Sequence, residues 1–74
     1  MDPVSLELTN AEALVLFAWM TRNDEAELLQ IEDHAEQRVL WTLEGQLEKT
    51  LVETLAPNYA NLLEAARAEV REQS

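Results

Sequence analysis

The sequence predicts a mainly α-helical fold: a small three-helix domain over residues 1–74, with a short N-terminal β-strand that pairs across a homodimer. Two observations on composition support this prediction. The chain of 74 residues has one Gly and two Pro, so few turn signals interrupt it. Hydrophobic residues make up 47% of the sequence, which is too many for a disordered chain. Helical spacing of apolar residues over long stretches is the third observation.

Residues 4–8, Val-Ser-Leu-Glu-Leu, alternate apolar and polar side chains, as a half-buried strand does. A lone strand exposes unpaired backbone groups, and antiparallel pairing with the same segment of a second copy would satisfy them. The alternative is an extended arm whose Leu8 packs against the first helix.

The first helix is predicted over residues 10–22. Thr9 and Glu12 have the spacing of a capping box, and the polar run 21–24 breaks the apolar pattern. The apolar residues of this helix surround its axis, so it must be covered on most faces. Because so short a chain offers little cover, we expect a second copy to supply the rest.

An acidic connection is predicted over residues 23–32, and a second helix over residues 33–55. Asp24 with Glu27, and Asp33 with Glu36, are both possible caps, and we favour the second pair because it gives the helix an acid-rich first turn. One apolar stripe of the second helix comprises Val39, Leu40, Leu43, Leu47, Leu51 and Leu55.

Gly45 lies between Trp41 and Val52 on the wheel of this second helix, at the edge of its stripe. Since a mid-helix Gly costs about 1 kcal/mol relative to Ala, it suggests that a helix or an indole ring approaches closely there. The predicted dimer interface therefore comprises Val4, Leu6, Leu8, Phe17, Trp19, Trp41, Gly45 and Val52.

The third helix is predicted over residues 58–72. Pro57 ends the preceding helix because its ring disfavours helical geometry at Ala56. Arg67 and Arg71 lie towards the C-terminus of the third helix, where positive charge suits the helix dipole.

The charge balance restricts the classes of partner. Fifteen acidic against five basic side chains give a net charge of −10, which argues against nucleic acid and against anionic membranes. The longest apolar run, residues 14–20, is too short to span a bilayer. A secretory signal would begin with basic residues, but no basic residue precedes Arg22. We therefore expect a cytoplasmic protein.

Acidic residues without any base are concentrated between positions 24 and 36. Such a segment attracts cationic surfaces and accelerates association with them. The leading hypothesis is therefore a small acidic homodimeric interaction protein that binds a basic protein, as a regulator, an immunity protein or an antitoxin does. The alternative is that the acidity serves solubility only. The predicted partner surface comprises Asp24, Glu25, Glu27, Glu32, Asp33 and Glu36.

The competing hypothesis is a metal-binding or small-molecule module. Glu32, Asp33, His34 and Glu36 bring carboxylates together with the one His, but Ile31 stands where a Glu-x-x-His pair would need its Glu.

A small-molecule pocket would be lined by the rings of Trp19 and Trp41, with Tyr59 supplying a hydroxyl. No cofactor and no catalytic residue are predicted, because no constellation of nucleophile, base or metal ligands is recognisable. We therefore do not expect an enzyme.

Three strings of the sequence resemble a group of short acidic helical bacterial proteins of uncharacterised function. The resemblance covers nearly the whole chain. It implies no activity, ligand or site, and it favours a bacterial cytosolic origin. The strings are Leu8-Thr9 with Glu12-Ala13-Leu14-Val15-Leu16-Phe17 and Trp19; Ile31-Glu32-Asp33-His34-Ala35-Glu36-Gln37 with Leu40-Trp41 and Leu47-Glu48-Lys49; and Tyr59-Ala60 with Leu62-Leu63 and Ala66-Arg67.

Overall fold

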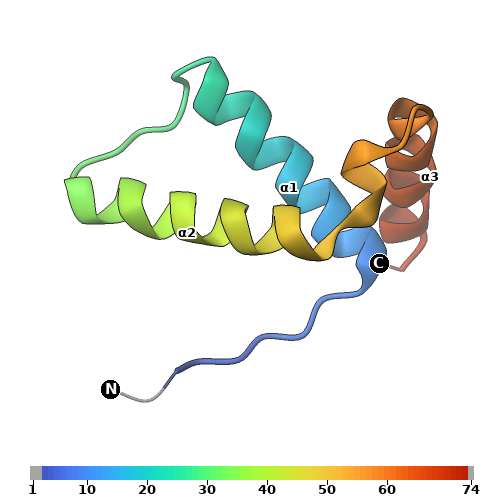
Figure 1. Ribbon diagram of the computed structural model, residues 1–74, viewed down its shortest axis with the longest axis horizontal. Helices are drawn as coiled ribbons and strands as arrows, with labels where there is room; N and C mark the ends of the chain where they lie inside the picture. The colour runs from blue at the N-terminus through green and yellow to red at the C-terminus, as the bar shows by residue number, and fades with distance from the viewer. Residues whose placement is uncertain (1–2, 74) are drawn as a thin grey trace.

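The computed structural model describes residues 3–73 and is helical, as the composition predicts (Figure 1). The elements, in chain order, are α1 (Asn10–Glu25), α2 (His34–Thr50), the short 3-10 helix η1 (Val52–Leu55) and α3 (Tyr59–Glu72).

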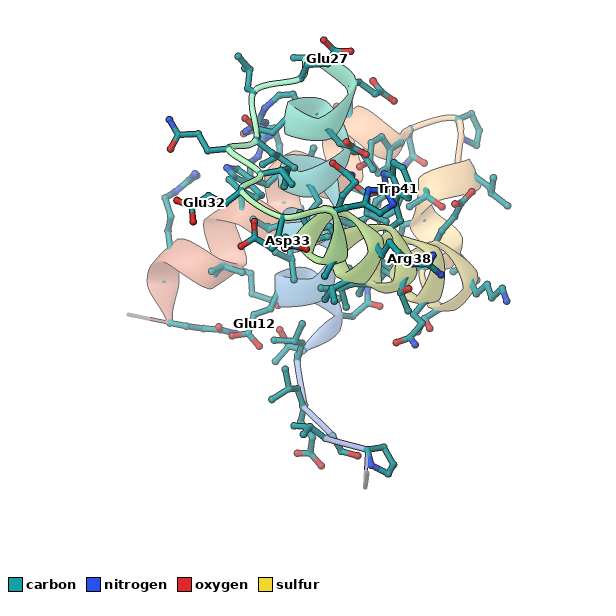
Figure 2. All side chains as sticks on the ribbon, turned by 90° about the vertical axis from the view of Figure 1, so that its left-hand side faces the viewer. Glu12, Glu27, Glu32, Asp33, Arg38 and Trp41 are labelled. Atoms are coloured by element: carbon teal, nitrogen blue, oxygen red, sulfur yellow. The ribbon has the colours of Figure 1, made fainter. Side chains whose placement is uncertain are left out.

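Residues 3–9 form an extended arm that projects away from the helices (Figures 1 and 2). No strand forms there within the described chain, so the strand predicted over 4–8 is not present in a single copy. The radius of gyration, 13.4 Å, exceeds the roughly 11 Å expected for a closely packed domain of this length. The projecting arm contributes to this difference.

Helix α1 packs against both α2 and α3. Its largest buried side chains, Leu14 and Met20, are 2% and 1% exposed. Ala11, Ala13 and Ala18 are also buried, and their small side chains allow the neighbouring helices to approach closely. Val15, Leu16 and Phe17 are half-buried and Trp19 is 46% exposed, so one chain covers α1 only in part.

Both capping boxes favoured from the sequence are confirmed. Thr9 Oγ1 accepts a hydrogen bond from the Glu12 amide at 3.1 Å, and the Thr9 amide donates to Glu12 Oε1 at 2.8 Å. Asp33 Oδ1 accepts from the Ala35 amide at 2.8 Å, while Glu36 Oε1 accepts from the Asp33 amide at 3.1 Å. These contacts fix the first turns of α1 and α2.

Helix α1 continues to Glu25, three residues beyond the predicted end. The polar residues do not break it, because Thr21 and Asn23 donate side-chain hydrogen bonds to helix carbonyls one turn earlier. The helix then closes with hydrogen bonds from the Leu28 amide to the Asn23 carbonyl (2.9 Å) and from the Glu27 amide to the Asp24 carbonyl (3.1 Å). Glu27 adopts the left-handed conformation of this closing motif, with φ at 56°.

Helix α2 ends at Thr50, five residues before the predicted end. Leu51 is extended, with φ −90° and ψ 104°, and its side chain is 1% exposed. The β-branched Thr50, Val52 and Thr54 around it weaken the helix at this point. The break turns Leu51 into the core, whereas Leu55, which the predicted stripe included, is 88% exposed on η1.

The last helix, α3, begins one residue after its predicted start and ends where predicted. It packs on α1 and η1, with Ala66 buried in the common core. The amide group of Asn10, at the start of α1, donates a hydrogen bond to Glu53 of η1. The element η1 thus connects the second and third helices to the beginning of the first.

Candidate interaction surface

An apolar hollow lies between the N-terminal arm, α1 and α2. Its volume is about 350 Å³, and no charged residue lines it. Val4 and Leu6 on the arm are 86% and 84% exposed, so their side of the hollow faces solvent. We call this feature the arm groove; it is lined by Val4, Leu6, Leu8, Ala13, Leu16, Leu43, Gln46, Leu47 and Thr50.

Two further hollows continue along α2: they share Val39 with each other, and one of them shares Leu43 and Gln46 with the arm groove. Val39 is 65% exposed and Leu43 is half-buried. We call the apolar residues that link these hollows the α2 strip; they are Ile31, Val39, Leu40, Leu43 and Leu47. Together the arm groove and the α2 strip form one largely apolar surface.

The structure brings together part of the predicted dimer interface. Val4, Leu6 and Leu8 all line the arm groove. Phe17 lies elsewhere, because it is half-buried against the core. Sequence patterning did not identify Ala13, Leu16, Gln46 or Thr50 as groove residues, since only the direction of the arm brings them together.

The remaining predicted interface residues are dispersed. Trp19 and Trp41 are 46% and 52% exposed on α1 and α2, and Val52 is 78% exposed on η1. A Cβ added at Gly45 would meet nothing within 4 Å. The close approach expected at Gly45 is therefore absent within the described chain.

Acidic residues of the predicted partner surface gather around the connection between α1 and α2, where Figure 2 shows Glu27, Glu32 and Asp33. Asp33 and Glu36 are occupied in capping α2. Glu25, Glu27 and Glu32 are exposed, and their side chains make none of the hydrogen bonds or ion pairs recorded for residues 3–73. These three carboxylates are the part of the predicted surface that faces solvent without a structural role.

Asp24, the sixth predicted acid, instead links α1 to α2. Its two carboxylate oxygens accept hydrogen bonds from Gln37 Nε2 and Trp41 Nε1, both at 3.3 Å. The indole of Trp41 is thereby oriented by a polar contact rather than by a neighbouring ring.

Glu44 adjoins this contact, and sequence reasoning did not identify it. Its Oε1 is buried without a hydrogen-bond partner among the described residues. Burial, followed by the negative charges of Asp24 and Glu25, raises the pKa of Glu44 above its ordinary value of 4.5. A carboxyl group at position 44 that holds its proton can donate to Asp24, whereas an ionised one is repelled.

The predicted metal ligands do not converge. Within residues 3–73 no group of three or more His, Asp and Glu side chains is placed to hold a metal ion. His34 is exposed at the first position of α2, between Asp33, which caps the helix, and Ala35. The cluster Glu32-Asp33-His34-Glu36 is thus the acidic start of a helix.

The predicted aromatic pocket is also not assembled, because neither Trp19 nor Trp41 lines the arm groove, the hollows along α2 or the hollows between α1 and α3. Tyr59 lies at a different hollow, between α1 and α3.

None of the helices in residues 3–73 combines the length and the apolar character needed to cross a bilayer. No protein-family model, curated protein or solved structure matches the chain. The resemblance to short acidic bacterial proteins therefore stays a prediction.

Proposed function

We propose that the protein is a small acidic interaction protein that forms a homodimer and binds a basic protein partner. The observation that carries this proposal is the arm groove, where Val4 and Leu6 stand in solvent beside an uncharged apolar surface. Burying a side chain of this size stabilises an assembly by about 1.5–3 kcal/mol. Contiguous exposed apolar surface of this kind is typical of interaction sites.

Charge favours a second copy as the occupant of this surface. Each copy carries a net charge of −10, so two copies repel wherever their acidic ends face each other. The arm groove has no charge, and the hollows along α2 add Arg38 and Glu36, which offset each other. This face is therefore one on which two copies can meet without net repulsion.

A two-fold arrangement would let the two surfaces cover each other. The α2 strip of one copy would lie against that of its partner, and the two arms would pair antiparallel beside this contact. The arm would then take up its backbone hydrogen bonds between copies, as the predicted strand pairing requires.

The variant Leu6→Ser tests self-association, with Leu55→Ser as the matched control. Leu55 is as exposed as Leu6 but lies on η1, outside the arm groove. Sedimentation velocity across a dilution series should show that Leu6→Ser dissociates at higher concentrations than the wild type, while Leu55→Ser does not. Equal behaviour of both variants, or a wild type that is monomeric throughout, would contradict the proposed dimer.

The proposed surface for a basic partner is the exposed acidic connection with Glu25, Glu27 and Glu32. These carboxylates project from one end of the molecule and leave the α2 strip uncovered, so both contacts can form at once. Regulators, immunity proteins and antitoxins that neutralise cationic proteins use acidity in this way. We expect such a role in the cytoplasm and no catalytic activity.

A lysine-rich peptide is a suitable probe of the acidic connection. Its addition should shift the backbone NMR resonances of residues 24–36 more than those of α3, and added salt should suppress the shifts. Replacing Glu25, Glu27 and Glu32 with Gln should weaken binding more than replacing Glu48, Glu69 and Glu72. Equal weakening by both triple variants would mean that the acidity acts diffusely, for solubility.

A further inference from the structure

A hollow of about 560 Å³ between α1 and α3 gathers positive charge in an otherwise acidic molecule. The sequence has five Lys and Arg residues, and two of them, Arg22 and Arg67, line this one hollow. The lining is completed by Ala18, Thr21, Glu25, Ala26, Tyr59 and Leu63. Two cations and one carboxylate make this lining net positive, whereas the chain as a whole is strongly negative.

The polar side chains that line the hollow carry N–H and O–H groups that can donate hydrogen bonds. Neither the guanidinium of Arg22 nor the hydroxyl of Tyr59 takes part in a hydrogen bond recorded for the described residues. Arg67 Nη1 donates a hydrogen bond to Glu64 Oε1 at 2.8 Å, and the guanidinium group has further N–H groups. Guanidinium groups match the planar geometry of a carboxylate.

The other walls of the hollow are apolar. Leu63 of α3, Ala18 of α1 and Ala26 at the end of α1 provide apolar surface for a hydrocarbon group. A ligand with a charged head and an apolar body would thus find both parts of its structure matched, which is the usual composition of a small-molecule site. The carboxylate of Glu25 and the ion pair of Arg67 with Glu64 limit the excess of positive charge at the hollow, which favours an anion of single charge.

We propose that this hollow binds a small monocarboxylate with an apolar body. The guanidinium groups of Arg22 and Arg67 hold the carboxylate, the Tyr59 hydroxyl donates a further hydrogen bond, and the apolar body lies on Leu63 and Ala18. This site lies between α1 and α3, away from the arm groove. Its occupancy is therefore independent of the proposed dimer.

The test is an NMR titration with 4-phenylbutyrate, using 4-phenylbutanol as the uncharged ligand of similar shape. We expect 4-phenylbutyrate to shift the amide resonances of Thr21, Tyr59 and Leu63 saturably, and 4-phenylbutanol to cause no saturable shift. Arg22→Gln should weaken binding roughly tenfold, as the loss of one charge-assisted hydrogen bond implies. Arg38→Gln makes the same charge change on α2, outside the hollow, and should leave binding unchanged.

Three outcomes would overturn the proposal: no saturable shift with 4-phenylbutyrate, equal binding of the alcohol, or equal weakening by Arg22→Gln and Arg38→Gln. Arg67→Gln, with its helix content checked by circular dichroism, is a second variant that should also weaken binding. The shifts report on residues 21, 59 and 63 only, so they are separable from dissociation of a dimer at the arm groove.

Discussion

The two sides of helix α1 are built differently. On the α3 side, Ala11 and Leu14 meet Leu62 and Ala66, and the hydrogen bond from Asn10 to η1 closes the end. On the α2 side, the helix pair leaves the arm groove and the α2 strip partly open, and Glu44 Oε1 is buried without a hydrogen-bond partner among residues 3–73. Both sides of the central helix thus keep a hollow, but only the hollow on the α2 side is free of charged residues, which suits contact with a second copy.

The largest expected effect tests the packing of α1 against α3. Leu14→Ala removes a side chain that is 2% exposed and leaves a cavity between α1 and α3, so we expect the free energy of unfolding to fall by about 3 kcal/mol. Leu55→Ala, at an 88% exposed position, should change it by less than about 0.5 kcal/mol. Urea denaturation measures both, and similar effects of the two would contradict the burial of Leu14 in the core.

The exposure of α2 at Gly45 is tested next by Gly45→Ala. A Cβ at this position of α2 meets nothing within 4 Å, so the higher helix propensity of Ala should raise the free energy of unfolding by about 1 kcal/mol. Thermal unfolding under dilute conditions measures this. Destabilisation of the dilute protein would mean that α2 is covered more closely at Gly45 than the structure shows.

A smaller gain, of about 0.5–1 kcal/mol, is expected from Glu27→Gly, because Glu27 has a φ of 56° that Gly adopts without steric cost. Ala26→Gly is the matched control, since Ala26 has right-handed helical geometry and gains nothing from Gly. If both variants changed the thermal midpoint equally, the closing turn of α1 would not be the source of the effect.

The smallest effect concerns the carboxyl group that α1 and α2 share. The pKa of Glu44 is raised in the folded protein. The stability that its protonated form provides is therefore fully present below the unfolded pKa, near 4.5, and is lost as the pH rises through the folded pKa. We expect Glu44→Gln to stabilise the protein at neutral pH and to flatten this pH dependence. Glu48→Gln is the control on the same helix. Parallel pH profiles for wild type and Glu44→Gln would contradict the assignment.

Features of the fold that depend on residues close together in the chain could be predicted from the sequence. The capping boxes at Thr9 and Asp33 were predicted because each depends on residues only three positions apart. The end of α2 was not, because the inward turn of Leu51 depends on how η1 packs against α3.

The candidate surfaces were only partly predictable. The arm residues and the acidic connection follow from alternation and charge, which are local patterns. The burial of Glu44 beside Asp24 and the joint lining of one hollow by Arg22 and Arg67 link residues far apart in the sequence. No periodicity within one helix marks such pairs.

The central claim is that the arm and the α2 strip complete their cover in a second copy. Light scattering of the full chain across a dilution series, beside a chain lacking residues 1–8, tests it most directly. We predict twice the monomer mass for the full chain at high concentration, and dissociation of the shortened chain at concentrations where the full chain stays dimeric. A full chain with monomer mass throughout, or a dimer unaffected by removal of the arm, would contradict it.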